Sequence, residues 1–228
     1  MGDGNRAPDV KLARQLERRL EDALDHLAGR IFRGGLHVSE LAARLAREAE
    51  LAEFRTPAGP ATANRFTLEL NPANLAGDPE PLARELELVF TELAADRGWR
   101  LEGPVEVSLG PSEEVGVGTI ASSASVASGA LPCWAQLTSP SGEKILIRHN
   151  RAVIGRSTDA DVVLDYPEIS RTHALIYRQG GEIYVVDTGS ANGTRVDGVT
   201  VGRAPTRVAP VAELTLANHP FRFTPCRS

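Results

Sequence analysis

The hydrophobic periodicity of the chain changes near residue 110, and this change constrains the fold more than any other feature. Before it, apolar residues recur every three or four positions, the spacing of an amphipathic helix, as at Leu12, Leu16, Leu20, Leu24, Leu27 and Ile31. After it, short β-branched runs such as RAVIG, HALIYR, EIYVVD and FRF are separated by turn residues. The sequence therefore predicts two domains of different class.

The first part combines further helical patterns with two strand-like runs. Apolar residues keep a helical spacing over residues 41–49, and again after Asp78, where two prolines open a helix. Residues 66–70 and 105–109 alternate between apolar and polar side chains, which is typical of a half-buried strand. We therefore expect residues 10–109 to form a small α+β domain.

Residues 110–132 separate the two patterns. Small and polar residues predominate there and no periodicity is present, which is the composition of a flexible linker. Residues 133–226 remain for an all-β domain. We expect this domain to be a β-sandwich, because short strands divided by regular turns pack as two sheets.

Charge and composition exclude several classes of protein. The net charge of −5 gives no general attraction to nucleic acid or anionic membranes, and no run of about 18 apolar residues is present to span a membrane. The first ten residues lack the apolar core of a signal peptide. We therefore expect a cytoplasmic protein.

The two cysteines, Cys133 and Cys226, have neither metal-ligand nor redox-motif spacing. In a cytoplasmic protein the favoured interpretation is a pair of free thiols. A disulfide is the alternative, because both residues lie at the edges of the β-rich part, where the two ends of a sandwich can come close.

Two turn motifs in the β-rich part carry groups that suit a phosphate ligand. Gly155 lets the chain turn at low steric cost and leaves Arg156 at the rim, where a planar guanidinium matches phosphate oxygens two at a time. Ser170 and Arg171 add a hydroxyl donor, loop amides and a second positive charge. A surface arginine in a turn is the alternative for Arg156, and the Gly-Arg pair alone favours that alternative.

His173 and the pair Asn192-Gly193 complete the set of motifs. No third group is evident to orient His173 as a base for Ser170, so we expect the histidine ring to bond loop backbone and fix the loop. Asn-Gly between strands is a strong hairpin signal by itself, which is the alternative at Asn192. The asparagine amide also offers a donor and an acceptor that can clamp the backbone of a peptide.

The joint order of these motifs resembles the forkhead-associated (FHA) domain, from about Trp134 to Phe223. The resemblance rests on Gly155-Arg156, Ser170-x-x-His173, Asn192-Gly193 and Thr194-x-Val196-Asp197-Gly198. FHA domains are eleven-stranded β-sandwiches that bind phosphothreonine peptides through loops at one end. The resemblance implies a phosphothreonine-containing partner, either a Ser/Thr kinase or its substrate, with no cofactor and no metal.

The resemblance also implies a role for each motif residue. The phosphate would be held by Arg156, Ser170 and Arg171, and the peptide backbone by Asn192. The loops would be shaped by Gly155, His173 and Gly193.

Two further residues bear on such a site. Ala191 stands where many FHA domains have threonine, and the missing hydroxyl would lower affinity up to about tenfold, with Ser190 and a backbone amide as the remaining donors. Thr119 lies in the expected linker, where a kinase finds extended chain. Phosphate on Thr119 would create a ligand for the chain's own sandwich, across a flexible tether of about 15 residues, or for the sandwich of a neighbouring molecule. An ordinary linker threonine is the alternative, and it is the favoured one.

The N-terminal part resembles the N-terminal domain of bacterial FhaA-type proteins over about residues 10–109, on RQLERRLEDALDHLAGRIF, NRFTLELNP and GPVEVSL. The leading hypothesis is therefore an adaptor that binds phosphothreonine in bacterial Ser/Thr kinase signalling. The alternative is a nucleic-acid or ribosome-associated regulator acting through the N-terminal domain, against which the acidic net charge counts. An enzyme is not expected, because the chain has no Gly-x-Ser-x-Gly, no Walker motif and no metal-ligand cluster.

Overall fold

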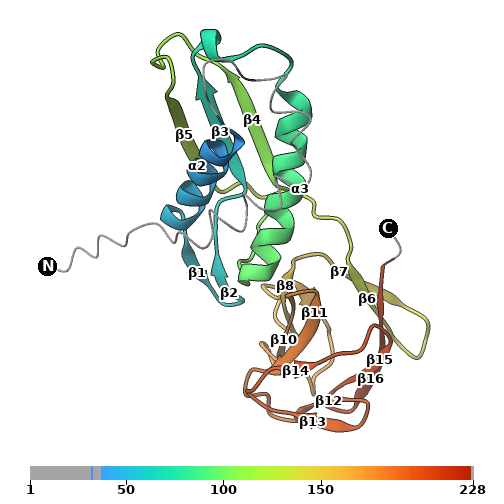
Figure 1. The fold of residues 1–228 in the computed structure, drawn as a ribbon. Helices are drawn as coiled ribbons and strands as arrows, with labels where there is room; N and C mark the ends of the chain where they lie inside the picture. The colour runs from blue at the N-terminus through green and yellow to red at the C-terminus, as the bar shows by residue number, and fades with distance from the viewer. Residues whose placement is uncertain (1–31, 33–36, 227–228) are drawn as a thin grey trace, which may run out of the picture. The chain divides into compact units, whose positions relative to one another are not determined.

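The computed structural model describes Phe32 and residues 37–226 (Figure 1). The helix predicted over residues 12–31 lies outside the described residues. Among the described residues, the chain divides into two compact units. The first takes residues up to Phe54 with Ala61–Ala94 and Glu102–Gly129, and the second takes Arg55–Pro60, Ala95–Leu101 and the residues from Ala130 onward.

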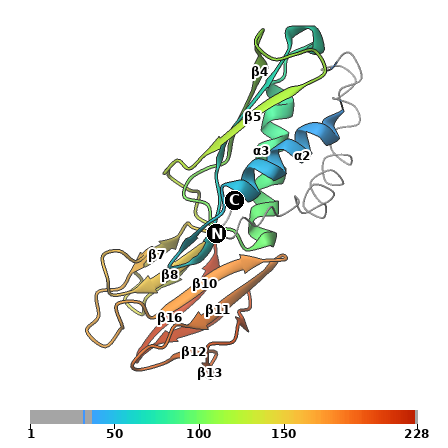
Figure 2. The same ribbon diagram turned by 90° about the vertical axis from the view of Figure 1, so that its left-hand side faces the viewer.

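The first unit is built on a three-stranded sheet with two helices on one face (Figure 2). Strand β3 is central; it pairs in parallel with β4, across the connection that contains α3, and antiparallel with β5. The helices and strands before the sandwich in the chain are α2 (Val38–Leu51), β1 (Phe54–Thr56), β2 (Gly59–Ala61), β3 (Arg65–Leu70), η1 (Pro72–Asn74), α3 (Glu80–Arg97), β4 (Glu106–Pro111) and β5 (Ile120–Ser125). Most of β1 and β2 and the last residues of α3 fall within Arg55–Pro60 and Ala95–Leu101, which belong to the second unit.

Alternation along β3 explains how this sheet acquires a core. Phe66, Leu68 and Leu70 are buried, while the residues between them are partly or fully exposed. Phe66 packs edge-to-face on Phe90 of α3 with ring centroids 4.8 Å apart. Each such buried aromatic side chain contributes about 1.5–3 kcal/mol, so α3 is fixed on the sheet by its apolar face.

The prediction of a flexible linker over residues 110–132 is wrong for residues 120–125, which form β5. This strand pairs with β3 along its whole length, from Leu70↔Ile120 to Arg65↔Ser125. It combines one β-branched residue, Ile120, with alanines and serines, so its composition does not signal a strand. Pairing with β3 satisfies its backbone groups, which is the main requirement for a strand of small side chains.

The second unit is a β-sandwich of the eleven strands β6–β16, which confirms the predicted all-β class (Figure 1). One sheet has the order β14-β11-β10-β8-β9 and the other β13-β12-β15-β16-β6-β7. The strands are β6 (Ala135–Thr138), β7 (Lys144–Ile147), β8 (Arg151–Gly155), β9 (Val162–Val163), β10 (Ala174–Gln179), β11 (Glu182–Asp187), β12 (Thr194–Val196), β13 (Val199–Val201), β14 (Thr206–Arg207), β15 (Ala212–Leu216) and β16 (His219–Pro225).

The two sheets enclose an apolar core. Ile154, Ile176 and Val185 come from the five-stranded sheet, and Leu214 and Phe223 from the six-stranded one; all five are fully buried. This rigid core holds the loops that join the strands, so residues at one end of the sandwich keep a fixed spacing.

A disulfide joins Cys133 to Cys226, so the prediction of free thiols is wrong. Strands β6 and β16 are antiparallel neighbours in which Pro225 faces Ala135, and the Cys226 amide donates to the Trp134 carbonyl. This pairing brings the two cysteine Cα atoms to 6.0 Å, within the normal range for a disulfide.

Candidate phosphate-binding site

One end of the five-stranded sheet brings together the three motifs of the predicted site, which are Gly155-Arg156, Ser170-x-x-His173 and Asn192-Gly193. Ala174, at the start of β10, pairs with Ile154 of β8 on one side and with Asp187 of β11 on the other. The chain leaving β8, the chain entering β10 and the chain leaving β11 therefore lie side by side. The site residues far apart in sequence come together because these strands are adjacent in the sheet.

Arg156 reaches this end with most of its guanidinium available. Its backbone N–H donates to the Ser170 carbonyl at 2.9 Å, and its Nε donates to the Ile169 carbonyl at 3.2 Å. These two bonds fix the direction of the exposed side chain. Its terminal nitrogens make no hydrogen bond or ion pair with the described residues, so a planar pair of donors faces outward.

Gly155 is required by a close approach of two backbone segments. A Cβ at this position would lie 2.1 Å from the carbonyl oxygen of Arg171. The backbone φ of Gly155 is not positive, so the expected advantage in turning sharply does not explain the glycine. The absence of a side chain is what lets the loop after β8 pack on the loop before β10.

His173 joins two loops through both nitrogens of its ring. The Ser170 N–H donates to His173 Nδ1 at 3.1 Å, which makes Nδ1 an acceptor and places the ring proton on Nε2. Nε2 then donates to the Gly193 carbonyl at 3.1 Å. The ring is fully buried, and this burial lowers the pKa of His173, so the neutral form is held.

The loop from Asp187 to Gly193 is organised by a carboxylate that the sequence analysis missed. Asp187 Oδ1 accepts the N–H groups of Gly189 and Ser190, both at 2.8 Å. Its Oδ2 accepts the hydroxyls of Ser190 at 2.6 Å and Thr194 at 2.8 Å. Burial opposes the charge, but these hydrogen bonds outweigh it and lower the pKa of Asp187. The signal was present in Asp-x-Gly-Ser, an aspartate placed to bond backbone two residues ahead.

The Ser190 hydroxyl was expected to donate to a phosphate in place of the threonine that Ala191 replaces, but its proton is already used within the loop. Its hydroxyl proton goes to Asp187, and its oxygen accepts the Gly193 N–H at 2.9 Å. The Ala191 amide donates to Ser170 Oγ at 3.0 Å. This last bond leaves the Ser170 hydroxyl proton without an acceptor among the described residues, and available to an anion.

The Asn192 side chain is exposed, and only the nitrogen end of its amide has a hydrogen-bond partner in the described part of the chain. Its Nδ2 donates to the Glu168 carbonyl at 2.8 Å, and its amide oxygen has no partner in the described part of the chain. The Glu168 side chain pairs with His219 at 3.1 Å, and this hydrogen bond lowers the pKa of Glu168. The amide of Asn192 is therefore held in one orientation while its acceptor remains open.

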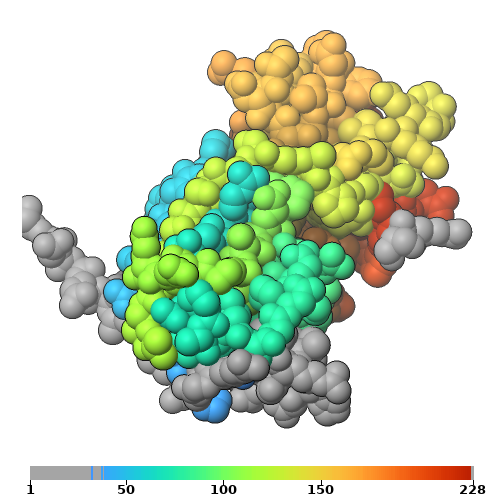
Figure 3. Space-filling view, turned by 90° about the horizontal axis from the view of Figure 1, so that it is seen from above, coloured from blue at the N-terminus to red at the C-terminus, as the bar shows by residue number. Residues whose placement is uncertain are grey.

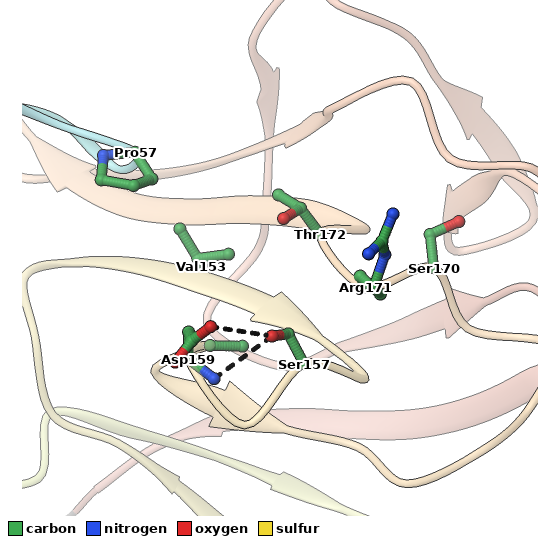
Figure 4. Close-up of a pocket in the computed structure, with 8 residues that line it drawn as sticks. Pro57, Val153, Ser157, Asp159, Ser170, Arg171 and Thr172 are labelled. Carbon is green, nitrogen blue, oxygen red and sulfur yellow. Dashed lines mark hydrogen bonds between the residues drawn. The ribbon is translucent and has the colours of Figure 1, made fainter.

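A depression of 570 Å³ borders Ser170 and Arg171 (Figure 4). Ser157 and Asp159 form a hydrogen-bonded turn on another of its sides, with Ser157 Oγ donating to the carboxylate at 3.4 Å. The lining residues are Pro57, Val153, Ser157, Asp159, Ala160, Ser170, Arg171 and Thr172. Its wall mixes apolar and polar side chains, as a site for a peptide side chain requires.

The arrangement suits anion binding and not nucleophilic catalysis. His173 bonds the backbone of Ser170 and not its hydroxyl, so it does not activate Ser170 as a nucleophile. Across residue 32 and residues 37–226, no group of three or more His, Cys, Asp or Glu side chains is placed to hold a metal ion. Nor does the described part contain a helix long and apolar enough to cross a membrane.

Thr119, the expected phosphosite, belongs to the first unit and not to this cluster. It lies in the loop between β4 and β5, which is at the surface of that unit (Figure 3). Its hydroxyl donates to the Gly116 carbonyl at 2.6 Å, and the loop is fastened by bonds from Asn71 to Val115 and from the Gly118 amide to Asn74. The threonine is therefore in a folded loop and not in extended chain.

Comparison with known proteins identifies both parts of the chain. The FHA domain model matches residues 152–217, and the model of the FhaA N-terminal domain matches residues 13–123. The glycogen accumulation regulator GarA of Mycolicibacterium smegmatis is 43% identical over 56 residues, which are 25% of this chain and 35% of GarA. FhaB of Mycobacterium tuberculosis is 38% identical over 63 residues, 28% of this chain and 41% of FhaB.

Among solved structures, Mycobacterium tuberculosis EmbR in complex with a low-affinity phosphopeptide is similar. The identity is 27% and the TM-score 0.39, over 42% of this chain and 25% of EmbR. The chain spans less than half the length of GarA and of FhaB, the two curated relatives given above.

Proposed function

The chain joins an FhaA N-terminal domain to a C-terminal FHA domain, and from this premise we propose that it is a phosphothreonine-dependent adaptor in bacterial Ser/Thr kinase signalling. The FHA sandwich binds a phosphorylated threonine on a kinase or on a kinase substrate. The N-terminal domain then brings a second function to the bound protein.

One observation carries this proposal: unused donors converge at one end of the sandwich. Arg156 presents its terminal nitrogens, Ser170 its hydroxyl proton, and Arg171 an exposed guanidinium without a partner in the described residues. A phosphorylated side chain carries a charge of about −1.5 to −2 and offers three acceptor oxygens. Such a ligand supplies the acceptors and the charge that these donors lack.

Asn192 supplies the second half of recognition. Its open amide oxygen accepts a backbone N–H from the peptide that carries the phosphate. Binding therefore combines charge at one point with a backbone contact beside it, which suits an extended, phosphorylated segment better than free phosphate. A cytoplasmic location belongs to this proposal, because Ser/Thr kinases phosphorylate their substrates there.

Calorimetry with a phosphothreonine peptide tests the proposal, using the intact chain and Arg156→Ala. Removing one member of a hydrogen-bonded charge pair costs about 2–5 kcal/mol, so affinity should fall by more than about tenfold. Arg222→Ala is the matched control, because Arg222 is an exposed arginine on β16 without an ion pair among the described residues. Circular dichroism should show all three proteins folded, and unchanged affinity in Arg156→Ala would falsify the assignment.

A further inference from the structure

The hairpin of β1 and β2 contributes residues 55–60 to the second unit, although they lie in the segment that matches the FhaA N-terminal domain. The Ala58 carbonyl accepts a hydrogen bond from Arg151 Nε at 2.8 Å. The Arg151 guanidinium in turn lies over the ring of Tyr177, 4.3 Å from its centroid. These contacts fasten the hairpin to the five-stranded sheet, so Pro57 in its turn has a fixed position on the sandwich.

Pro57 lines the depression that borders the phosphate site. Figure 4 shows Ser170 on one side of this depression and Pro57 on the other. Val153 also lines it; this residue stands between two core residues of β8, so its side chain faces away from the core. The depression therefore continues from the phosphate loops onto the outer face of the sheet. Its wall at Pro57 comes from outside residues 152–217, the segment that matches the FHA domain.

The loop after β8 adds an acidic side chain to the wall. The Asp159 N–H donates to Ser157 Oγ at 3.3 Å, and the Ser157 hydroxyl donates to Asp159 Oδ2 at 3.4 Å. Two residues later, Asp161 pairs with Arg100 through two bonds of 2.7 Å and accepts the Val153 N–H at 2.8 Å. The base of this loop is therefore fixed, and Asp159 Oδ1 has no hydrogen-bond partner among the described residues.

The depression keeps one unused charge when a phosphate is bound beside it. Its wall contains two charged residues, Asp159 and Arg171. Under the proposed function the phosphate neutralises Arg171, which leaves the Asp159 carboxylate. The apolar side chains of Pro57, Val153 and Ala160 line the same depression. A long basic side chain matches this combination, because its aliphatic stem packs on apolar surface while its cationic head reaches the carboxylate.

The order of the loops decides which part of a bound peptide reaches the depression. The Asn192 loop follows β11, the Ser170 loop precedes β10 and the Asp159 loop follows β8, and β10 lies between the other two strands. A peptide that bonds Asn192 on one side of its phosphothreonine therefore passes the depression on the other side. Neighbouring strands lie about 4.8 Å apart and extended chain advances about 3.3 Å per residue, so the residue concerned is about one to three positions from the phosphothreonine.

We propose that this depression is a second subsite, which binds an arginine or lysine side chain of the phosphorylated partner on the side of the phosphothreonine away from Asn192. This inference rests on the proposed function and names its ligand class more closely: a phosphothreonine segment with a basic residue on that side. Pro57 and Asp159 are the specificity-determining residues, one as an apolar wall and the other as the opposite charge. The subsite is composite, because the FHA segment alone does not contain Pro57.

The test measures, by calorimetry, the affinity of the intact chain for phosphothreonine peptides with arginine, glutamine or glutamate in turn at each position up to about three residues on either side. The wild-type chain should prefer arginine to glutamine about two- to fivefold at a position on one side, and glutamate should bind most weakly there. Peptides methylated on single backbone nitrogens locate the N–H that Asn192 accepts, and the preference should fall on the other side. Raised salt should reduce it, because exposed charges are screened.

Asp159→Asn should make the arginine and glutamine peptides bind equally, and Pro57→Ala should weaken the preference for arginine. Glu143→Gln is the matched control and should keep the preference, because it removes an exposed carboxylate from the turn between β6 and β7 in the other sheet. Equal binding of arginine and glutamine peptides to the wild-type chain, a preference that survives in Asp159→Asn, or a preference on the Asn192 side overturns the inference alone. Failure of the wild-type chain to bind any phosphothreonine peptide overturns the proposed function and this inference together.

Discussion

At the scale of single residues, Gly155 decides whether the phosphate loops can assemble. Its added Cβ would meet backbone of Arg171 at 2.1 Å, and backbone cannot swing aside as a side chain can. We predict that Gly155→Ala lowers the free energy of unfolding by about 1–3 kcal/mol, the usual cost of overpacking. Phosphopeptide affinity should fall in the same variant, because Ser170 and Arg171 move with the displaced loop.

Gly202→Ala is the matched control for this prediction. An added Cβ at Gly202 meets nothing within 4 Å, and its φ is not positive. Urea unfolding of the three proteins measures the difference. A Gly155→Ala protein as stable as Gly202→Ala would show that the two loops can separate without cost.

His173 makes the stability of the sandwich depend on pH. Burial lowers its pKa below the ordinary value of 6.5, whereas the unfolded chain retains that value. The unfolded state therefore binds more protons as pH falls below 6.5, and the folded state loses stability. We predict full stability above this value and a decline towards pH 5, and a smaller decline in His173→Gln.

The measurement compares melting of the wild-type and His173→Gln proteins between pH 8 and pH 5, so that the other titrating groups cancel. At pH 8, His173→Ala should already melt at a lower temperature and bind phosphopeptide more weakly, because Ser170 and Gly193 lose the ring that joins them. Parallel pH curves for wild type and His173→Gln would assign the pH dependence to other groups.

At the scale of elements, the disulfide fastens the first strand of the sandwich to the last. Cys133 and Cys226 are 93 residues apart in sequence, and closing a loop of about 100 residues stabilises a fold by about 4–5 kcal/mol in the chain-entropy model. We predict that a reductant lowers the melting temperature of the wild-type chain. Cys133→Ser/Cys226→Ser should melt at the lower temperature with or without reductant, and a wild-type melting curve unaffected by reductant would contradict the prediction.

The individual strands show which parts of the fold can be predicted from the sequence alone. The runs RAVIG and EIYVVD coincide with β8 and β11, because β-branched side chains mark strands that pack on a core. Strand β5 was not predictable in this way, since its alanines and serines depend on β3 for pairing. The disulfide depends on the order of strands in the six-stranded sheet, and no local pattern contains that order.

The candidate site shows the same difference between what local sequence predicts and what depends on the fold. The residue types that suit phosphate were readable from Arg156, Ser170 and Arg171, because their chemistry is local. The use of Ser190 by Asp187, and the bond from the Ala191 amide to Ser170, depend on which loops meet at the end of the sheet. Local chemistry identifies candidate donors, whereas the fold decides which of them remain free.

At the scale of the whole molecule, the structure changes how Thr119 relates to a phosphothreonine site. The tether after it is not flexible as expected, because residues 120–125 are paired in β5. Beyond this strand, Asn64 bonds both the N–H and the carbonyl of Ala127 at 2.9 Å, and the Gly129 N–H donates to the Glu102 carbonyl. The chain that would have to bend back for self-closure is therefore held in the first unit as far as Gly129.

We predict that phosphate on Thr119 joins two molecules and does not close one on itself. Phosphorylation removes the hydroxyl proton that bonds the Gly116 carbonyl, so the loop opens and presents the phosphothreonine outward. The test is treatment with a bacterial Ser/Thr kinase, mapping of the site by mass spectrometry, and light scattering over a range of protein concentrations. Phosphorylated wild-type chain should dimerise as its concentration rises, whereas Thr119→Ala and Arg156→Ala should stay monomeric, because one lacks the ligand and the other its receptor. A phosphorylated monomer that no longer binds external phosphopeptide would indicate self-closure. If the kinase places no phosphate on Thr119, Thr119 is not a phosphorylation site and the prediction is wrong.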